Sequence, residues 1–235
     1  MSGVTPAVVS NAVIAGLPRG EQRRLLAELE PVDLISGAVL CEPGKRQREV
    51  YFPLSGCISL AASVAGHPPM DMVLIGSEGM LGLHLELGIG NDVPMLGIVK
   101  CAGSALRMPA ARFRGQLPLN PGLSRAMNRQ LFGLLGHVAR TAACTSFHEV
   151  QARLALWMLI THDRAHSDHF HLTHERLADM LGVQRSAVTI AAGAIQRARV
   201  ISYSRGEIHV LDRAGLEAMS CGCYRASLPS ALRPD

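Results

Sequence analysis

The side chains best suited to hydrogen-bond a polar ligand gather around residue 185. An amide, a guanidinium and two hydroxyls occupy nearby positions in Gln184, Arg185, Ser186 and Thr189. Arginine and glutamine can each make paired hydrogen bonds to the edge of a base, and hydroxyls can add single bonds. Two further candidates flank this set, Thr173 upstream and Arg205 downstream. The combination predicts contacts with nucleic acid.

The surrounding sequence predicts two helices that would hold these groups. Thr173 is placed to cap a first helix, and Gly182 ends it because a tight turn there needs a residue that tolerates positive φ. A second helix is expected from 184 to 199. Its polar start would face outward, and its buried face would carry Val188, Ala192 and Ile195.

A hairpin is expected directly after the second helix. Two apolar runs, 200–203 and 208–211, flank a turn that contains Arg205 and Gly206. A helix pair followed by such a hairpin is a winged helix-turn-helix, whose second helix enters the major groove of duplex DNA. The alternative is a small helical bundle that only packs, but the order of these signals favours DNA binding.

Histidines just upstream form a second group with possible chemistry. Those considered as metal ligands are His162, His166, His169 and His171. Imidazole at this density, with Asp163 and Asp168 nearby, suits Zn(II), Ni(II) or Fe(II). We favour the alternative, a solvated polar hinge without metal. Cys221 and Cys223, in an expected loose tail from 220, could chelate a soft metal or oxidise, but their two-residue spacing brings no further ligands nearby, and we favour no function for them.

Composition bounds the class of protein. The 235 residues are 48% hydrophobic and 18% charged, which predicts a folded chain with a substantial core, and a net charge of +4 limits nucleic-acid contact to a local surface. Six scattered cysteines in a chain of this size predict free thiols and a reducing, cytoplasmic location. No stretch has the pattern of an export signal or a membrane span.

The N-terminal half changes character twice. Residues 7–30 predict two short helices, broken near Pro18. Residues 31–115 are rich in glycine, which separates short apolar runs at 38–40, 49–52, 57–60, 72–75, 96–99 and 105–108. Runs this short at such spacing predict an antiparallel β-roll or barrel.

A long helix is expected after Pro121. A stripe of residues on it steps by four and three, as in a coiled-coil seam: Met127, Leu131, Leu134, Val138, Thr141 and Thr145. The stripe predicts a homodimer through this helix, and operators with two half-sites suit a two-fold symmetric protein. The alternative is that the stripe packs on its own β-domain.

This order of elements resembles the Crp/Fnr family of bacterial transcription regulators. The resemblance covers residues 14–224 and rests on the segments 37–44, 50–56, 76–82 and 172–188. It implies an α+β fold with an N-terminal double-stranded β-helix, a long dimerisation helix and a C-terminal winged helix-turn-helix. The domains expected are a cyclic-nucleotide-binding-like roll with its helices (1–117), the dimerisation helix (118–147), the DNA-binding domain (148–224) and a tail (225–235).

The resemblance also implies roles for particular residues. The position of Arg185 contacts a base, most often guanine, and Thr173 becomes a candidate phosphate anchor. Family members that bind cyclic nucleotide use a Gly-Glu-Leu-Gly turn and an Arg-Ser pair. Here the turn runs from Gly79 through Met80 to Gly82, and Asp92 stands near the position of the pair. Cyclic nucleotide is therefore not expected, and no cofactor is identifiable; haem through His67 or His84 stays a lower-ranked alternative.

No catalytic motif is present, and an enzyme is not expected. We predict a transcription regulator of the Crp/Fnr type that reads a palindromic operator as a homodimer, with double-stranded DNA and RNA polymerase as partners and no membrane. The alternative is a small-molecule or metal-binding sensor module whose helix-turn-helix does not read DNA sequence. Only the first class predicts salt-sensitive, sequence-selective DNA binding.

Overall fold

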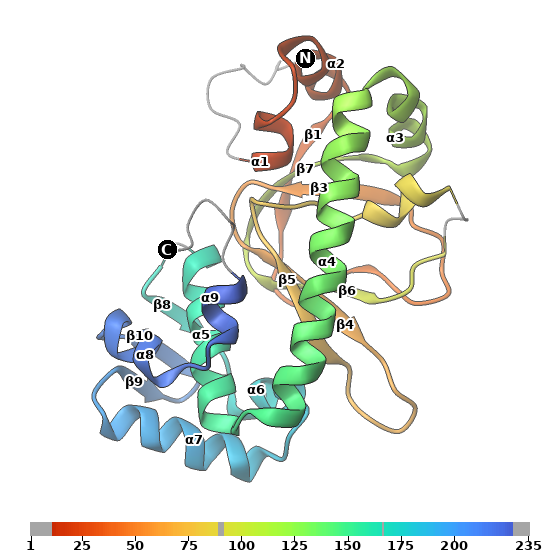
Figure 1. The fold of residues 1–235 in the computed structure, drawn as a ribbon. Coiled ribbons are helices and arrows are strands. Elements are labelled where there is room, and N and C mark those ends of the chain that lie inside the picture. The colour runs from red at the N-terminus through yellow and green to blue at the C-terminus, as the bar shows by residue number, and fades with distance from the viewer. Residues whose placement is uncertain (1–10, 89–91, 166, 228–235) are drawn as a thin grey trace. The chain divides into compact units, whose positions relative to one another are not determined.

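The computed structural model describes residues 11–88, 92–165 and 167–227 (Figure 1). The chain divides into two compact units. The N-terminal unit comprises residues 1–61 and 74–136, and the C-terminal unit comprises residues 62–73 and 137–235. In the described part of the chain, no helix combines the length and the apolar character needed to cross a membrane.

The N-terminal unit is a β-roll flanked by short helices. Its elements are α1 (Ala12–Ala15), α2 (Arg19–Glu28), β1 (Glu30–Leu34), β2 (Val39–Cys41), β3 (Glu49–Pro53), β4 (Cys57–Ala62), η1 (Leu83–Leu87), β6 (Leu96–Cys101), β7 (Gly103–Pro109), α3 (Ala110–Gln116) and η2 (Leu117–Leu119). β5 (Met70–Ile75) crosses the boundary between the units. Every apolar run expected as a strand forms one, and β1 is an additional strand that the sequence analysis did not single out.

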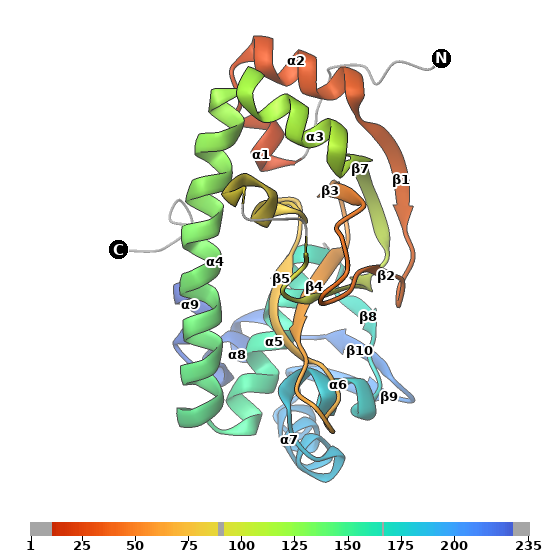
Figure 2. The same cartoon turned by 90° about the vertical axis from the view of Figure 1, so that its right-hand side faces the viewer.

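Two antiparallel sheets build the roll. One has the strand order β1-β7-β3, and the other has the order β2-β6-β4-β5. Figure 2 shows β1 and β7 running side by side. Their register places Glu30 opposite Arg107. Arg107 also lies opposite Tyr51 of β3, and its guanidinium contacts the carboxylates of Glu30 at 2.8 Å and Glu49 at 3.3 Å. An ion-pair network thus crosses all three strands of the first sheet.

The core of the N-terminal unit joins the helices to the roll. Leu25 of α2, Phe52 of β3 and Phe113 of α3 are fully or almost fully buried in one cluster. Asn11 is also fully buried: its side chain caps α1 and its amide donates to the carbonyls of Pro53 and Gly79 at 2.9 and 2.8 Å. The N-terminal helices are therefore part of the core of the roll.

The long helix α4 (Pro121–Phe147) begins in the N-terminal unit and ends in the C-terminal unit (Figure 1). The buried carboxylate of Glu21 accepts hydrogen bonds from the backbone N–H groups of Gly122 and Leu123, both at 3.2 Å. These N–H groups have no partner within the helix, and a carboxylate there also complements the helix dipole. Glu21 therefore fixes the start of the expected long helix.

The C-terminal unit contains helices around a small sheet. Its elements are α5 (Val150–Ala165), β8 (His169–His171), α6 (His174–Leu181), α7 (Arg185–Arg197), β9 (Ile201–Ser204), β10 (Glu207–Val210), α8 (Arg213–Met219) and α9 (Cys223–Ser227). The strand order is β8-β10-β9. With the roll, the long helix and the winged helix-turn-helix all present, the expected fold class is confirmed.

Two expectations about irregular segments were wrong. The polar hinge is partly regular, because α5 continues to Ala165 and His169–His171 form a strand against β10. Within the segment expected to be loose from residue 220, Cys223–Ser227 form α9, whose Tyr224 is 1% exposed. The Tyr224 hydroxyl donates to Asp163 at 2.8 Å and accepts from Arg213 at 2.6 Å. Pro229 and Pro234 lie outside the described residues.

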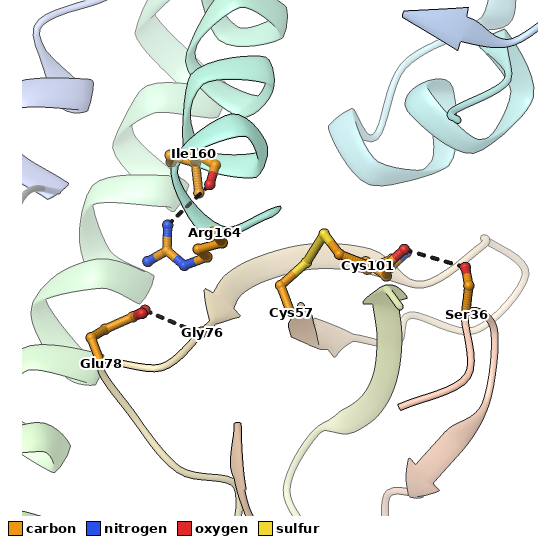
Figure 3. Close-up of a disulfide and its surroundings, with 8 residues drawn as sticks. Ser36, Cys57, Gly76, Glu78, Cys101, Ile160 and Arg164 are labelled. Atoms are coloured by element: carbon orange, nitrogen blue, oxygen red, sulfur yellow. Dashed lines mark hydrogen bonds between the residues drawn. A yellow bond between two sulfur atoms is a disulfide. The ribbon is translucent and has the colours of Figure 1, made fainter. Parts of the chain in front are cut away.

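The cysteines of the roll also differ from expectation. Cys57 and Cys101 face each other across β4 and β6 and form a disulfide, where only free thiols were predicted (Figure 3). Next to this pair, the Ser36 hydroxyl donates to the carbonyl of Lys100 at 3.3 Å. The two cysteines are 44 residues apart, so that only the strand register brings them together.

Candidate nucleic-acid interface

The two helices of the predicted motif form as expected. The Thr173 hydroxyl caps α6 by accepting from the backbone N–H of Arg176 at 3.3 Å. Gly182 ends α6 with φ +63, and its αL conformation turns the chain directly into α7. A side chain at this position would be strained in φ and would also approach the Met70 sulfur within 2.7 Å.

The start of α7 presents polar side chains outward. Its buried face carries Val188, Ala192 and Ile195, as predicted. Gln184, Arg185 and Ser186 are exposed, and Gln184 makes no side-chain capping bond, which leaves its amide available to a ligand.

Further along the exposed face of α7, two side chains differ in what they can offer. Ile190 is 72% exposed and provides an apolar surface. The Thr189 hydroxyl is already engaged, donating to the carbonyl of Arg185 at 3.1 Å with His174 Nδ1 at the same distance. This engagement weakens Thr189 as a hydroxyl donor to a base.

His174 lies between the helices and the hairpin. Its ring is 4.7 Å from the ring of Tyr203, and its Nδ1 contacts Thr189. Burial and the positive charge of Arg185 hold the pKa of His174 below its usual value. His174 is therefore neutral near pH 7, and Arg185 provides the positive charge at this end of α7.

The hairpin β9–β10 is the predicted wing. Arg205 and Gly206 occupy its turn with φ of 52° and 87°, the left-handed pair that two-residue hairpin turns require. Arg205 is exposed at the tip. At the base, the Tyr203 hydroxyl donates to the carbonyl of Leu172 at 2.8 Å, which ties the wing to the segment that precedes α6.

The hinge histidines pair with carboxylates in separate places. His162 Nε2 contacts Asp168 at 2.6 Å, whereas His169 and His171 both contact Glu207 of the wing. The contact with His171 is the largest cause of the lowered pKa of Glu207. His166 lies outside the described residues. The histidine candidates that are described do not converge on one group of metal ligands.

The predicted seam of α4 faces the same chain. Met127 is fully buried in the core of the N-terminal unit, and Leu131 and Leu134 pack against that core. In the C-terminal unit, the Thr141 hydroxyl donates to the carbonyl of Met72 at 2.9 Å. The Thr145 hydroxyl donates to the carbonyl of Thr141 within the helix. Val138 is half-buried.

The apolar side chains that α4 exposes lie one position further along the sequence. Phe132 is 80% exposed and Leu135 is 68% exposed. The exposed ridge has the same four-three spacing as the predicted seam and consists of Asn128, Phe132, Leu135, Ala139, Ala142 and Ser146. The predicted stripe thus contributes to packing on its own chain, and dimerisation through α4 stays a prediction.

The sequence analysis missed one group of metal-ligating side chains in the C-terminal unit. Cys144, His148, Cys221 and Cys223 bring their ligand atoms within 4.8 Å of one another. The hydrogen bond between the Cys144 and Cys221 sulfurs is the largest cause of a lowered pKa at Cys221. Cys221 and Cys223 were considered without partners, and no local sequence signal connects them with a helix end more than seventy residues away.

Comparison with known proteins agrees with this geometry. Residues 152–219 match the model of the Crp-like helix-turn-helix domain. No curated protein sequence matches the chain. The similar solved structures below share at most 16% of their residues with this chain, so that their likeness concerns the fold.

Three solved structures illustrate that likeness. A transcriptional regulator assigned to the Crp/Fnr family from Eubacterium rectale superposes with a TM-score of 0.69 at 16% identity, covering 89% of this chain and 98% of its own. FixK2 from Bradyrhizobium japonicum gives 0.68 at 13%, covering 83% and 98%. The c-di-GMP-responsive global regulator CLP from Xanthomonas campestris gives 0.67 at 15%, covering 82% and 99%. The chain thus carries a Crp-like helix-turn-helix domain on the fold of the Crp/Fnr transcription regulators.

Proposed function

We propose that this protein is a cytoplasmic, sequence-specific transcription regulator that binds a palindromic operator as a homodimer and contacts RNA polymerase. The observation that carries the proposal is the exposed polar start of α7, held by a capped α6 and an αL turn within a Crp-like domain. Each protomer would place one α7 in the major groove of one half-site. The wing tip at Arg205 and the capped start of α6 at Thr173 would contact phosphates.

The hydrogen-bonding groups and methyl groups that α7 exposes limit which bases it can recognise. Arg185 offers two parallel donors to guanine, and Gln184 offers a donor and an acceptor to adenine. Ile190 has no hydrogen-bonding group, and its exposed methyl groups suit the methyl group of thymine. Ser186 can add a single bond. A half-site that combines guanine with nearby A·T pairs is expected.

The exposed ridge of α4 supports the homodimer. Phe132 and Leu135 would leave a large apolar surface in water in an isolated chain, and their heptad spacing suits pairing with a second copy. Small residues, Ala139 and Ala142, continue the ridge toward the C-terminal end and permit close approach of two helices. The two-fold axis would then run along α4.

The roll supports an effector other than a cyclic nucleotide. Met80 and Leu81, in the turn where nucleotide-binding relatives carry an acid, are buried at 0% and 3% exposure. Asp92, near the position of the phosphate-binding pair, would repel a phosphate. We therefore infer that the effector of this protein is a ligand or signal other than a cyclic nucleotide.

A selection from random duplex DNA followed by gel shifts tests the DNA-binding part of the proposal. We expect a palindromic consensus. Arg185→Ala should weaken binding to each half-site by about 5- to 150-fold, the value of one bidentate contact of about 1–3 kcal/mol, and should weaken binding of the dimer by the square of that factor because both protomers lose the contact. Arg197→Ala is the matched control, because Arg197 is exposed at the far end of the same helix and carries the same charge. Failure to select any sequence would instead support a sensor module that does not read DNA.

Sedimentation tests the dimer independently of DNA. Phe132→Glu places a charge in the centre of the ridge and should convert a dimer into a monomer at micromolar concentration. Phe147→Glu makes the same chemical change at a residue of α4 that is 83% exposed but lies off the ridge, and it should leave the dimer intact. A wild-type monomer, or a dimer unaffected by Phe132→Glu, would contradict the assigned interface.

A further inference from the structure

Four metal-ligating side chains converge in the C-terminal unit. The Cys144 and Cys221 sulfurs are 3.6 Å apart, and His148 Nδ1 lies 3.4 Å from Cys144 Sγ and 3.6 Å from Cys223 Sγ. The four ligand atoms all lie within 4.8 Å of one another. Among the described residues, this is the group of His, Cys, Asp and Glu side chains placed closely enough to hold one metal ion. None of its four residues belongs to the proposed DNA interface or to the exposed ridge of α4.

The fold positions two of these ligands at the end of α4. Cys144 lies in the last turn of the helix and His148 follows four residues later, which places both side chains on one face. The backbone N–H of His148 donates to the carbonyl of Cys144 at 3.0 Å and extends the helical turn. Unpaired carbonyls at a helix C-terminus favour a cation there.

The other two ligands come from the connection between α8 and α9. Cys221 and Cys223 flank Gly222, and the N–H of Tyr224 donates to the carbonyl of Cys221 at 3.0 Å to close a tight turn. The buried Tyr224 ring, with its hydroxyl between Asp163 and Arg213, anchors α9 by contacts separate from the cysteines. The turn is therefore held in place by the surrounding fold.

Three of the six separations fit a single tetrahedral ion, and the other pairs lie within the 4.8 Å that bounds the group. Zn–S bonds of about 2.3 Å and Zn–N bonds of about 2.0–2.1 Å place two sulfurs about 3.8 Å apart and sulfur and nitrogen about 3.6 Å apart. The three separations given above, 3.6, 3.4 and 3.6 Å, lie within 0.2 Å of these values. An iron–sulfur cluster spreads its ligands over several iron atoms, so that this compact group suits one ion.

A buried cation beside the group fits its charge. The Arg153 side chain is only 6% exposed, and its guanidinium donates to the carbonyl of Leu181 and the hydroxyl of Thr145. Within the described residues it forms no ion pair with a carboxylate. One divalent ion with three thiolates and a neutral imidazole carries a net charge of −1, which Arg153 would neutralise.

We propose that Cys144, His148, Cys221 and Cys223 form a site for one thiophilic divalent cation, most readily Zn²⁺, which joins the end of α4 to the segment between α8 and α9. The proposal goes beyond DNA reading and does not depend on it. Four protein ligands leave no open position for a reacting water, so that the ion is structural or regulatory. His148 is exposed and Cys223 is half-buried, which gives the ion a route in and out.

The purified full-length chain tests the site directly. After thiol reduction and chelation without oxygen, Co²⁺ should bind at one ion per chain, with thiolate-to-cobalt absorption in the near ultraviolet and the intense visible bands of tetrahedral cobalt. Zn²⁺ should displace the cobalt and abolish these bands. Protein isolated from cells under the same exclusion of oxygen should contain one zinc per chain, and adding Zn²⁺ to the chelated protein should raise its thermal midpoint.

Two variants of accessible ligands limit the risk of misfolding. Cys223→Ser should weaken the thiolate band and allow a mild chelator to remove the metal. His148→Asn should keep the sulfur bands but bind Co²⁺ at least tenfold more weakly. Cys41→Ser is the matched control, because Cys41 is a free, buried cysteine of the roll, and it should behave as the wild type. Far-ultraviolet circular dichroism confirms that each variant is folded.

Several results would overturn the proposal. One is wild-type protein that gives no thiolate band, and another is cobalt binding that both ligand variants leave unchanged. Loss of cobalt on replacing His169 and His171 instead would move the metal to the wing. A Cys144–Cys221 disulfide in metal-free protein, isolated without oxygen, would show that the pair serves as a redox couple and not as a metal site.

Discussion

The turn of the roll at Gly79–Gly82 and the start of α7 each place a short segment after a glycine, but the side chains of the two segments face opposite ways. In the roll, Met80 and Leu81 point into the core. At α7, Gln184 and Arg185 point outward while Val188 packs inward. We therefore expect the shared fold to keep a binding surface at α7 but no cyclic-nucleotide site at this turn of the roll, because binding depends on which side chains remain outside the core.

Restoring the acid of nucleotide-binding relatives at Met80 gives the largest expected effect. Met80→Glu would place a carboxylate at a position with 0% exposure and no cation in its apolar cluster. We expect a loss of about 3 kcal/mol or more in the free energy of unfolding, measured by urea denaturation, and no gain of cyclic-nucleotide binding. A folded variant that binds cyclic nucleotide would show that the turn can open. It would contradict the conclusion that the turn of the roll, unlike the start of α7, offers no binding surface.

The turn that presents α7 gives the next largest effect. Gly182→Ala forces a Cβ into an αL residue close to the Met70 sulfur, and it should cost about 1–2 kcal/mol of unfolding free energy. It should also weaken operator binding, because Gly182 sets the direction of α7. Gly133→Ala is the opposite case: no atom lies within 4 Å of its added Cβ, and it should stabilise α4 by up to about 1 kcal/mol. Equal changes in unfolding free energy for the two variants would show that an alanine at position 182 is not strained.

The pH dependence of His174 gives the smallest effect. Because burial and Arg185 lower its pKa in the folded state, the unfolded chain binds the proton more tightly. The contribution of His174 to stability is therefore fully present above its unfolded pKa of about 6.5 and is lost as the pH falls below that value toward the folded pKa. Thermal midpoints at pH 7.5 and 5.5 should differ less in His174→Gln than in the wild type. An identical pH dependence would leave His174 without this role.

The local signals of the sequence determined the DNA-binding motif. The Thr173 cap, the αL conformation of Gly182 and the paired positive φ of Arg205 and Gly206 each depend on residues only a few positions away. Such interactions act before any tertiary contact forms, and the sequence therefore specifies them directly. The same holds for the short apolar runs of the roll, which all became strands.

Only the tertiary structure decided which side chains meet across long distances in the chain. Two stripes of α4, offset by one residue, share the same spacing, and packing against the core selected the stripe of Met127 and exposed the stripe of Phe132. His169–His171 became a strand because β10 offered backbone partners, whereas His162 lies on α5. Cys144 contacts Cys221, which is 77 residues away in the chain, because the folded C-terminal unit brings the two segments together. The physical cause is that side-chain spacing defines the faces of a helix, whereas the face that becomes buried is the one that gives the whole chain the greater burial of apolar surface.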